Sequence, residues 1–326
     1  MEKIHIRIIQ RSSELPVMKA DNFFHSPELF HITERTPGAT PFMVVAEDEQ
    51  KHCVAHLLAM IRRRGSLFPP FLYTNGRIYG QGEYDDNLEH PEEIFQMMLK
   101  AITLKFRRHL CLYVEVSDVH PKMFGYRIFR QCHYFPVHWQ EVHNSLHTKN
   151  PQEYLSKRTR QRIKKARAQG VETRAVKSID EVYAFYKLLK GFYRTKLRRM
   201  IPPEKQFMEL SRYEKAQILI TIYHGKIIGG SACVYSEGNA YLWYLASKRK
   251  SHPALHPNTM TIWYAIKYAY EHHYSHIFFM DVGLPFKKNP FMDFILKFGG
   301  KPVARYRWFR FYISWINRLL GWLFKE

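Results

Sequence analysis

Basic side chains are the residues of this chain best suited to bind a substrate, and many of them gather between residues 153 and 171. One acid, Glu153, stands in this stretch against seven cations: Lys157, Arg158, Arg160, Arg162, Lys164, Lys165 and Arg167. Such a surplus repels itself unless an anion lies nearby, so it predicts a docking surface for phosphate on nucleic acid, on a nucleotide-linked substrate or on an anionic membrane. A solvated helix face without a ligand is the alternative interpretation.

Two further basic residues are candidates for binding an anionic group. Lys248 opens the run KRKSHP, whose cations can hold phosphate through their side chains. Lys297 comes just before the pair Gly299-Gly300. A cation there can neutralise a carboxylate, a phosphate or a developing oxyanion, or it can lie in solvent.

Other common catalytic centres are not indicated. The chain has four scattered cysteines: Cys53, Cys111, Cys132 and Cys233. They have neither C-x-x-C spacing nor a close histidine pair, which argues against structural zinc and predicts free, buried thiols in a reducing compartment. His272 and His273 would point apart on a helix, so no metal ion is expected there. No G-x-S-x-G turn marks a nucleophile.

The elements that must position these residues follow from apolar periodicity, which predicts one order of strands and helices twice. The first set is strand 4–8, a helix capped by Ser26, a hairpin turning at 47–51, helix 91–108, strand 110–118, helix 122–132 and strand 133–147. Between the hairpin and helix 91–108, the Pro- and Gly-rich stretch 66–82 predicts a loop long enough to line a binding site.

The second set follows a basic helix within 153–170. It comprises strand 171–176, helices 179–197 and 204–210, three strands within 216–246, helix 259–272, strand 276–282, helix 291–298 and strand 303–311. Two copies of a mixed β/α order predict an α/β fold with mixed sheets, built by duplication. The expected domains are 1–148 and 149–300, followed by a last strand and tail at 301–326.

Size and charge limit the function classes. A chain of 326 residues that is 46% hydrophobic can bury two cores, and a formal net charge of +21 favours polyanionic partners. The start, MEKIHIRIIQ, lacks the apolar core of a signal peptide, and no apolar run reaches the roughly 18 residues of a membrane span. These features predict a cytoplasmic protein, with possible peripheral binding at the inner face of a membrane.

The end of the chain, RYRWFRFYISWINRLLGWLFKE, is apolar with cations at its edges. It is too short to span a bilayer but suits the membrane interface, where tryptophan and basic side chains anchor. A C-terminal helix docked on the other domain is the equally open alternative.

The basic helix also carries a family resemblance. Its pattern R-x-x-I-K-K-A-x-x-x-G-V is formed by Arg160, Ile163, Lys164, Lys165, Ala166, Gly170 and Val171. It resembles the entry to the C-terminal half of the FemABX-type aminoacyltransferases and their acetyltransferase-like relatives, which are built from two acetyltransferase (GNAT) folds in tandem. The resemblance implies two tandem GNAT-like domains with the acyl-CoA N-acyltransferase fold, and it spans nearly the whole chain.

The resemblance implies catalytic and binding residues near the end of the second set. Asp281 and Gly283 match a D-x-G motif, and Phe294 and Phe298 match the following F-K-x-x-F-G, with Ile295 at the lysine position. Lys297 is the nearest cation, so Lys297 and Asp281 are the catalytic candidates. Phe298 is a substrate-binding candidate, although core packing at helical spacing is the favoured interpretation of both phenylalanines.

The other substrate-binding candidates come from the same resemblance. They are Arg160, Lys164, Lys165, Lys196, Arg198, Arg199, Gly229, Gly230, Tyr244 and Lys248. For the two glycines a bulge in a strand is an equally good explanation, and for residues 196–199 so is surface solvation. Asn75, Gly80 and Tyr84 are placed in an acceptor cleft by position alone.

The implied activity is transfer of an aminoacyl group from aminoacyl-tRNA to an amine on a peptidoglycan precursor. No cofactor is expected, because the glycine-rich turn that holds the pyrophosphate of coenzyme A is replaced by residues 247–260, which hold no glycine. A nucleotide- or lipid-linked acceptor and an anionic membrane surface are the implied partners. Two alternatives stay open: an N-acyltransferase that uses acyl-CoA or acyl carrier protein on an amino acid or lipid, and a non-catalytic RNA- or membrane-binding protein.

Overall fold

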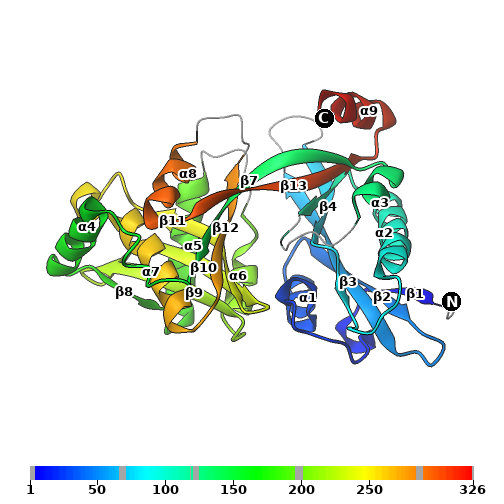
Figure 1. The fold of residues 1–326 in the computed structure, drawn as a ribbon, viewed down its shortest axis with the longest axis horizontal. Helices are drawn as coiled ribbons and strands as arrows, with labels where there is room; N and C mark the ends of the chain where they lie inside the picture. The colour runs from blue at the N-terminus through cyan, green and yellow to red at the C-terminus, as the bar shows by residue number, and fades with distance from the viewer. Residues whose placement is uncertain are drawn as a thin grey trace. The chain divides into compact units, whose positions relative to one another are not determined.

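The computed structural model describes residues 4–65, 71–117, 119, 125–194, 201–283 and 289–324. These form two compact units: the first is Met1–Trp139 with Arg305–Glu326, and the second is Gln140–Ala304 (Figure 1). The chain passes from one unit to the other inside two strands, β7 (Phe135–Ser145) and β13 (Lys301–Phe311).

The first unit is a mixed sheet with helices on both faces. Its strands lie in the order β1 (His5–Ile9), β2 (Ala39–Glu47), β3 (Cys53–Gly65), β4 (Leu72–Tyr79), β6 (Tyr113–Ser117) and β13, with β5 (Glu83–Tyr84) beside β3. All neighbours are antiparallel except β4 and β6. The helical segments are η1 (Ser12–Glu14), η2 (Phe23–His25), α1 (Pro27–Glu34), α2 (Pro91–Arg108), α3 (Tyr126–Gln131) and α9 (Ser314–Leu323).

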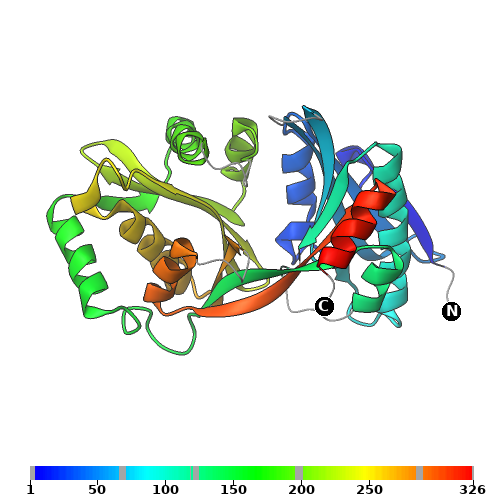
Figure 2. The same cartoon turned by 90° about the horizontal axis from the view of Figure 1, so that it is seen from above.

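The helices of this unit form where capping and periodicity predict them. Ser26 Oγ accepts a hydrogen bond from Leu29 N at 3.2 Å and so begins α1, with Pro27 in the first turn. The apolar stripe of α2 buries Met98 and Ile102 against the strands. Figure 2 shows α1 and α2 on opposite faces of this sheet.

The second unit repeats this plan. Its strands lie in the order β8 (Glu172–Ala175), β9 (Ala216–Tyr223), β10 (Lys226–Ser236), β11 (Asn239–Ser247), β12 (His276–Gly283) and β7. Again all neighbours are antiparallel except one parallel pair, β11 and β12. The helical segments are α4 (Lys157–Ala168), α5 (Ile179–Tyr193), α6 (Glu204–Leu210), η3 (Pro253–Leu255), α7 (Pro257–Glu271), α8 (Pro290–Ile295) and η4 (Leu296–Phe298).

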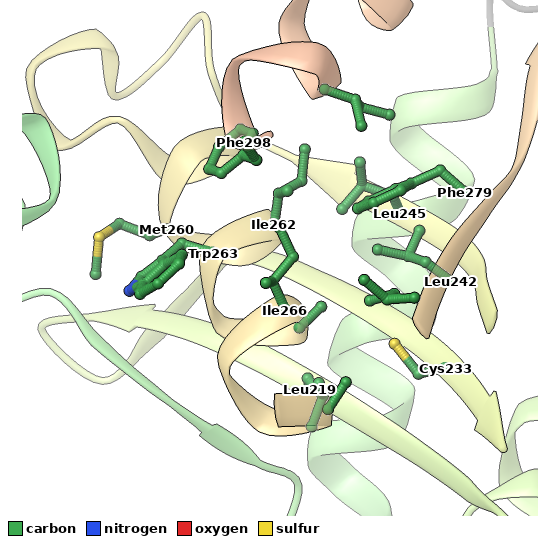
Figure 3. Close-up of a cluster of buried hydrophobic side chains, with 14 of the residues drawn as sticks. Leu219, Cys233, Leu242, Leu245, Met260, Ile262, Trp263, Ile266, Phe279 and Phe298 are labelled. Atoms are coloured by element: carbon green, nitrogen blue, oxygen red, sulfur yellow. The ribbon is translucent and has the colours of Figure 1, made fainter. Parts of the chain in front are cut away.

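A dense apolar core holds α7 against the strands of the second unit. Ile262 and Ile266 of α7 pack against Leu219, Leu242 and other strand residues of one buried cluster (Figure 3). Helices α5 and α6 cover the other face of the same sheet (Figure 2). The central strands β9, β10 and β11 are therefore mostly buried on both sides.

The mixed α/β fold and its duplicated strand order confirm the predicted architecture, but each unit takes its last strand from the other half of the chain. β7 ends the first predicted set of elements and pairs with β12 in the second unit, whereas β13 ends the second set and pairs with β6 in the first. The unit boundaries therefore fall inside β7 and β13, at 139/140 and 304/305, where the sequence predicts 148/149 and 300/301. Periodicity reveals a strand but not the sheet that it joins.

The loop predicted for 66–82 is wrong over residues 72–79, because Leu72–Tyr79 forms β4. Glycine is tolerated in this strand for a packing reason: a Cβ on Gly76 would lie 2.7 Å from the ring of Phe106 in α2. Helix α2 therefore packs directly on the backbone of Gly76. In the sequence alone, a glycine at this position predicts an interruption of the strand. Residues 66–70 lie outside the described residues.

Candidate functional site

Two neighbouring strands of the second unit separate toward their carboxyl ends. The parallel strands β11 and β12 pair over three residues each, Ala240–Leu242 with Ile277–Phe279. Although β11 continues to Ser247 and β12 to Gly283, the structure pairs them no further within these described strands. In the first unit the parallel pair β4 and β6 stays paired to the end of both strands. The second unit therefore presents strand edges to which an extended ligand can hydrogen-bond.

The separated part of β12 also bulges away from β7. Phe279 pairs with Val142 and Gly283 with Gln140, so three residues of β12, Met280–Val282, oppose the single residue Glu141. Bulges of this kind re-aim side chains and are common beside active sites. The predicted catalytic residue Asp281 belongs to this bulge, and its side chain lies outside what the structure describes.

A carboxylate–imidazole pair lies on β7 at this bulge. Glu141 Oε2 and His143 Nε2 are 3.0 Å apart, and the two side chains are only 6% and 14% exposed. The His143 ring lies 4.3 Å from the ring of Phe278 in β12. When Nε2 donates to the carboxylate, the other ring nitrogen, Nδ1, keeps its lone pair and can accept a proton. The sequence analysis missed this pair, although E-x-H in a predicted strand places both side chains on one face.

A second imidazole lies beside the pair. His276 of β12 stacks with Phe278 at 5.7 Å, and its Nδ1 lies 3.1 Å from Asn239 Oδ1. Burial, and then the neighbouring His147 and His143, lower the pKa of His276. The surroundings therefore favour uncharged imidazole, the form that accepts protons.

The basic helix α4 lies beside the N-terminus of α7. The residue before α7, His256, has φ 47° and ψ 48° and gives no side-chain cap, and α4 packs on both η3 and α7. Burial, and then the charges of Arg162 and Lys165, lower the pKa of His256, so these cations lie close to it. An uncapped helix N-terminus with cations beside it suits a phosphate group.

The cations on the polar side of α4 have no carboxylate partner among the described residues. Ser156 Oγ caps the helix by accepting from Thr159 N at 3.2 Å, and Thr159, Ile163 and Ala166 are its buried residues. Within the described part of the chain, no cation of α4 forms an ion pair with a carboxylate; Arg160 Nε donates to the Leu155 carbonyl at 3.0 Å. Lys164 and Lys165 are exposed, so they can reach an external anion.

Four of the predicted substrate-binding residues lie within the packed interior of the second unit. A Cβ on Gly229 would lie 2.3 Å from Thr261 Oγ1, and one on Gly230 would lie 2.6 Å from the ring of Phe185. Tyr244 and Phe298 are buried, and Phe298 belongs to the cluster around α7. In the described structure, packing of α5 and α7 explains both glycines.

We expect the change of Gly230 to Ala to lower the free energy of unfolding by about 1–3 kcal/mol, because the new methyl group would meet both Phe185 and the Leu219 carbonyl oxygen, 3.0 Å away. Urea unfolding would measure this. The matched control is Gly191→Ala in α5, where a Cβ meets nothing within 4 Å and stability should rise by about 0.5–1 kcal/mol. An unchanged stability of the Gly230 variant would contradict the packing explanation.

The remaining predicted cations are on the surface or outside the described residues. Lys248 is exposed and helps to line a cavity of about 850 Å³ beside β8, β9 and α5. Lys297 is exposed in η4, next to the buried Phe298. Lys196, Arg198 and Arg199 lie outside the described residues.

Of the candidates in the first unit, Asn75 and Gly80 are buried and Tyr84 is half-buried. Asn75 is fully buried in β4, and neither its Oδ1 nor its Nδ2 has a hydrogen-bond partner within the described residues. Tyr84 donates to the Gln81 carbonyl at 2.6 Å, and burial raises the pKa of its hydroxyl. Gly80 ends β4 with φ 80°, and its N–H donates to the Ser117 carbonyl at 2.6 Å.

Over the ranges that the structure describes, no group of three or more His, Cys, Asp or Glu side chains could hold a metal ion. All four cysteines are free thiols, three of them buried, and burial raises the pKa of Cys233 to about 12. No described helix is both long and apolar enough to cross a membrane.

Comparison with known proteins finds a domain-family match within the second unit. Residues 155–288 match the family described as acetyltransferase (GNAT) domain. No curated protein matches the chain. Similar solved structures include FemX, with a TM-score of 0.61 at 11% identity over 87% of this chain and 91% of that one.

Two more structures share the fold across both units. The C-terminal domain of a putative lysylphosphatidylglycerol synthetase from Agrobacterium fabrum has a TM-score of 0.57 at 11% identity, covering 91% of this chain and 90% of that one. A tandem GNAT protein from the clavulanic acid biosynthesis pathway also has a TM-score of 0.57, at 10% identity, covering 94% and 98%. The domain match and the shared fold support an acyltransferase.

Proposed function

We propose that this chain transfers an aminoacyl group, carried by tRNA, to an amine of a cell-envelope precursor such as the peptidoglycan stem peptide. The observation that carries the proposal is the separation of β11 and β12 inside the segment that matches the acetyltransferase domain. Strand edges without a ladder partner can bind an extended donor through its backbone-like groups and hold its carbonyl for attack.

The donor is inferred from charge. A tRNA presents many phosphates, and the unpaired cations of α4 beside the N-terminus of α7 form a broad basic surface rather than a single pocket. The run from Ser247 to Met260 contains no glycine, which disfavours close backbone contact with a pyrophosphate. An acyl-CoA or acyl carrier protein donor remains the alternative, because the same helix N-terminus could receive its phosphates.

The proposed acceptor and location are inferred from the names of proteins with similar structures. One neighbour is named as a synthetase of lysylphosphatidylglycerol, an aminoacylated lipid, and another as FemX, the type that the sequence resembles. These names suit the lipid- or nucleotide-linked acceptor of our proposal, which places the reaction at the inner face of a membrane. The third possibility is a protein that binds RNA or membrane without catalysis.

The described residues suggest how the transfer proceeds. The acceptor amine attacks the donor carbonyl carbon, a C–N bond forms, and the C–O bond to the ribose breaks. His143 takes the amine proton at Nδ1, Glu141 holds the ring through Nε2, and the leaving hydroxyl gains a proton in turn. Lys297 opposes the negative charge on the carbonyl oxygen, and Asp281 in the bulge remains a catalytic candidate.

A product assay tests this function. Purified protein is incubated with an amine-bearing precursor and either aminoacyl-tRNA or acyl-CoA, and mass spectrometry identifies the acylated product. Product from aminoacyl-tRNA alone supports the proposal. Product from acyl-CoA alone supports the first alternative, and binding without product from any donor supports the non-catalytic one.

Neutralising α4 should weaken tRNA binding selectively. With Lys164, Lys165 and Arg167 all changed to Gln, we expect the plot of log affinity against log salt to become less steep. The magnitude of its negative slope should decrease by about 2 to 3, since each lost phosphate contact lowers that magnitude by about 0.7–0.9. Filter binding at several salt concentrations measures the slope. The control changes the exposed Arg11, Lys51 and Arg127 of the first unit to Gln. Equal losses in both variants would indicate non-specific charge attraction.

A further inference from the structure

We propose that α9 is an interfacial anchor that seats this chain on an anionic lipid bilayer. The inference goes beyond the proposed transfer reaction and needs neither donor nor acceptor. It depends on the orientation of this helix. Figure 1 places α9 at the periphery of the first unit.

The side of α9 that contacts the protein leaves most of its large apolar side chains uncovered. Asn317 makes the specific contacts: its Oδ1 accepts from Phe311 N at 2.8 Å, and its Nδ2 donates to the His133 carbonyl at 3.0 Å. One turn later Gly321 lies against Phe135, where a Cβ would stand 3.7 Å away. The ring of Phe324 stacks on the same Phe135 at 6.2 Å. These contacts, with the half-buried Ile316 and Leu320 on the same side, attach the helix to the unit.

The large apolar side chains point the other way. Trp315 is 67% exposed, Leu319 53%, Trp322 71% and Leu323 62%, and no residue of α9 is buried. Their spacing of four, three and one places them along one face of the helix. Burying each such side chain is worth about 1.5–3 kcal/mol, so leaving four of them together in water is costly. The other side of α9 docks on the first unit, as the alternative from the sequence expects, but this face remains exposed.

The length and charge of the helix select a membrane surface as the occupant. Ten residues make a helix about 15 Å long, half of the roughly 30 Å needed to span a bilayer, so α9 can lie in the interface but not cross it. Tryptophan is the side chain most typical of that interface. A helix of this length is also short for the roughly 800 Å² that each partner buries in a stable protein dimer.

Cations around the base of α9 favour anionic lipid. The helix contains Arg318 and no acid. The guanidinium of Arg310, just before the turn into α9, lies 5.4 Å from the Tyr312 ring, and Tyr312 OH donates to the Thr103 carbonyl of α2 at 2.6 Å. The turn is thereby tied to the basic end of α2, where Arg107 is exposed. With a chain charge of +21, two copies would repel each other, whereas an anionic surface attracts.

Vesicle co-sedimentation of the full chain tests the proposal. We expect binding to vesicles of phosphatidylcholine mixed with phosphatidylglycerol, weaker binding to phosphatidylcholine alone, and at least about a tenfold loss of affinity when Trp315 and Trp322 are both changed to Ser. The matched control is Val17→Ser, which removes another exposed apolar side chain of the first unit, 98% exposed, and should bind as the wild type does.

Two binding results would overturn it: no sedimentation of the wild-type chain with either vesicle, or equal binding by the wild type and the double variant. A third would be light scattering that shows the wild type as a dimer and the double variant as a monomer. Both substitutions are on exposed positions, so thermal unfolding should confirm an intact fold. A second measurement needs no variant: quenching of tryptophan fluorescence by spin-labelled lipid requires the indoles to enter the interface. Lipid binding that persists in a chain without transfer activity would separate this inference from the proposed function.

Discussion

Replacing His143 by Gln is expected to slow acyl transfer by about 10²–10⁴-fold while leaving the fold intact. Proton transfer by a positioned imidazole contributes a factor of that size, and Gln keeps a hydrogen-bond donor toward Glu141 Oε2 but offers no basic nitrogen. Because the loss concerns proton transfer, kcat should fall and KM should change little. Steady-state kinetics with the donor identified by the product assay would measure both.

The partner residue gives a graded comparison. Glu141→Gln removes the charge that orients the ring, so we expect a smaller fall in kcat, recovered in part by Glu141→Asp. The control is His147→Gln, two residues after the end of the same strand, where His147 Nδ1 lies 3.0 Å from the Ser275 carbonyl at an exposed position. A His143 variant with full activity would exclude this pair from the chemistry, and an equal loss in the His147 variant would point to a structural effect.

Replacing Lys297 by Ala is expected to abolish most of the transfer, by about 10²–10³-fold, without unfolding the protein. Removal of one group that stabilises an oxyanion costs a factor of that order. Lys297 is exposed in η4, where it is adjacent to the core residue Phe298 but is not itself buried, so the alanine variant should unfold at the same temperature as the wild type. Single-turnover assays and thermal unfolding measure the two quantities.

The control for this prediction is Lys301→Ala, an exposed cation at the start of β13. Activity should survive that change. Undiminished transfer in the Lys297 variant would remove this residue from the site and leave Glu141 and His143 as the candidates.

Much of the fold could be predicted because local signals were strong. Ser26 caps a helix as its position predicts, and the structure adds Ser156 and Ser178 as caps, with the Ser178 hydroxyl accepting from Glu181 N at 3.3 Å. The three central strands of the second unit turn at His224-Gly225 and Glu237-Gly238, where all four residues have positive φ. Capping and tight turns depend on a few neighbouring residues, which is why sequence reveals them.

The candidate site was less predictable, because its parts come from distant segments. Residues 141 and 143 belong to a strand that periodicity assigns to the first half, yet β7 pairs with β12 of the second. Gly229 and Gly230 are consistent with a binding strand by sequence, but Thr261 and Phe185 occupy the adjacent space. Phe298 is a core residue, in agreement with its helical spacing.

By itself, the sequence determined the mixed α/β class, the duplicated order of elements and the cationic helix, because capping, periodicity and charge are local properties of a chain. Only the tertiary structure decided which sheet receives β7 and β13, where β11 and β12 separate, and which face of α9 meets solvent. Those features depend on pairing and packing between residues far apart in the chain, and the free energy of such contacts is set by the complete fold.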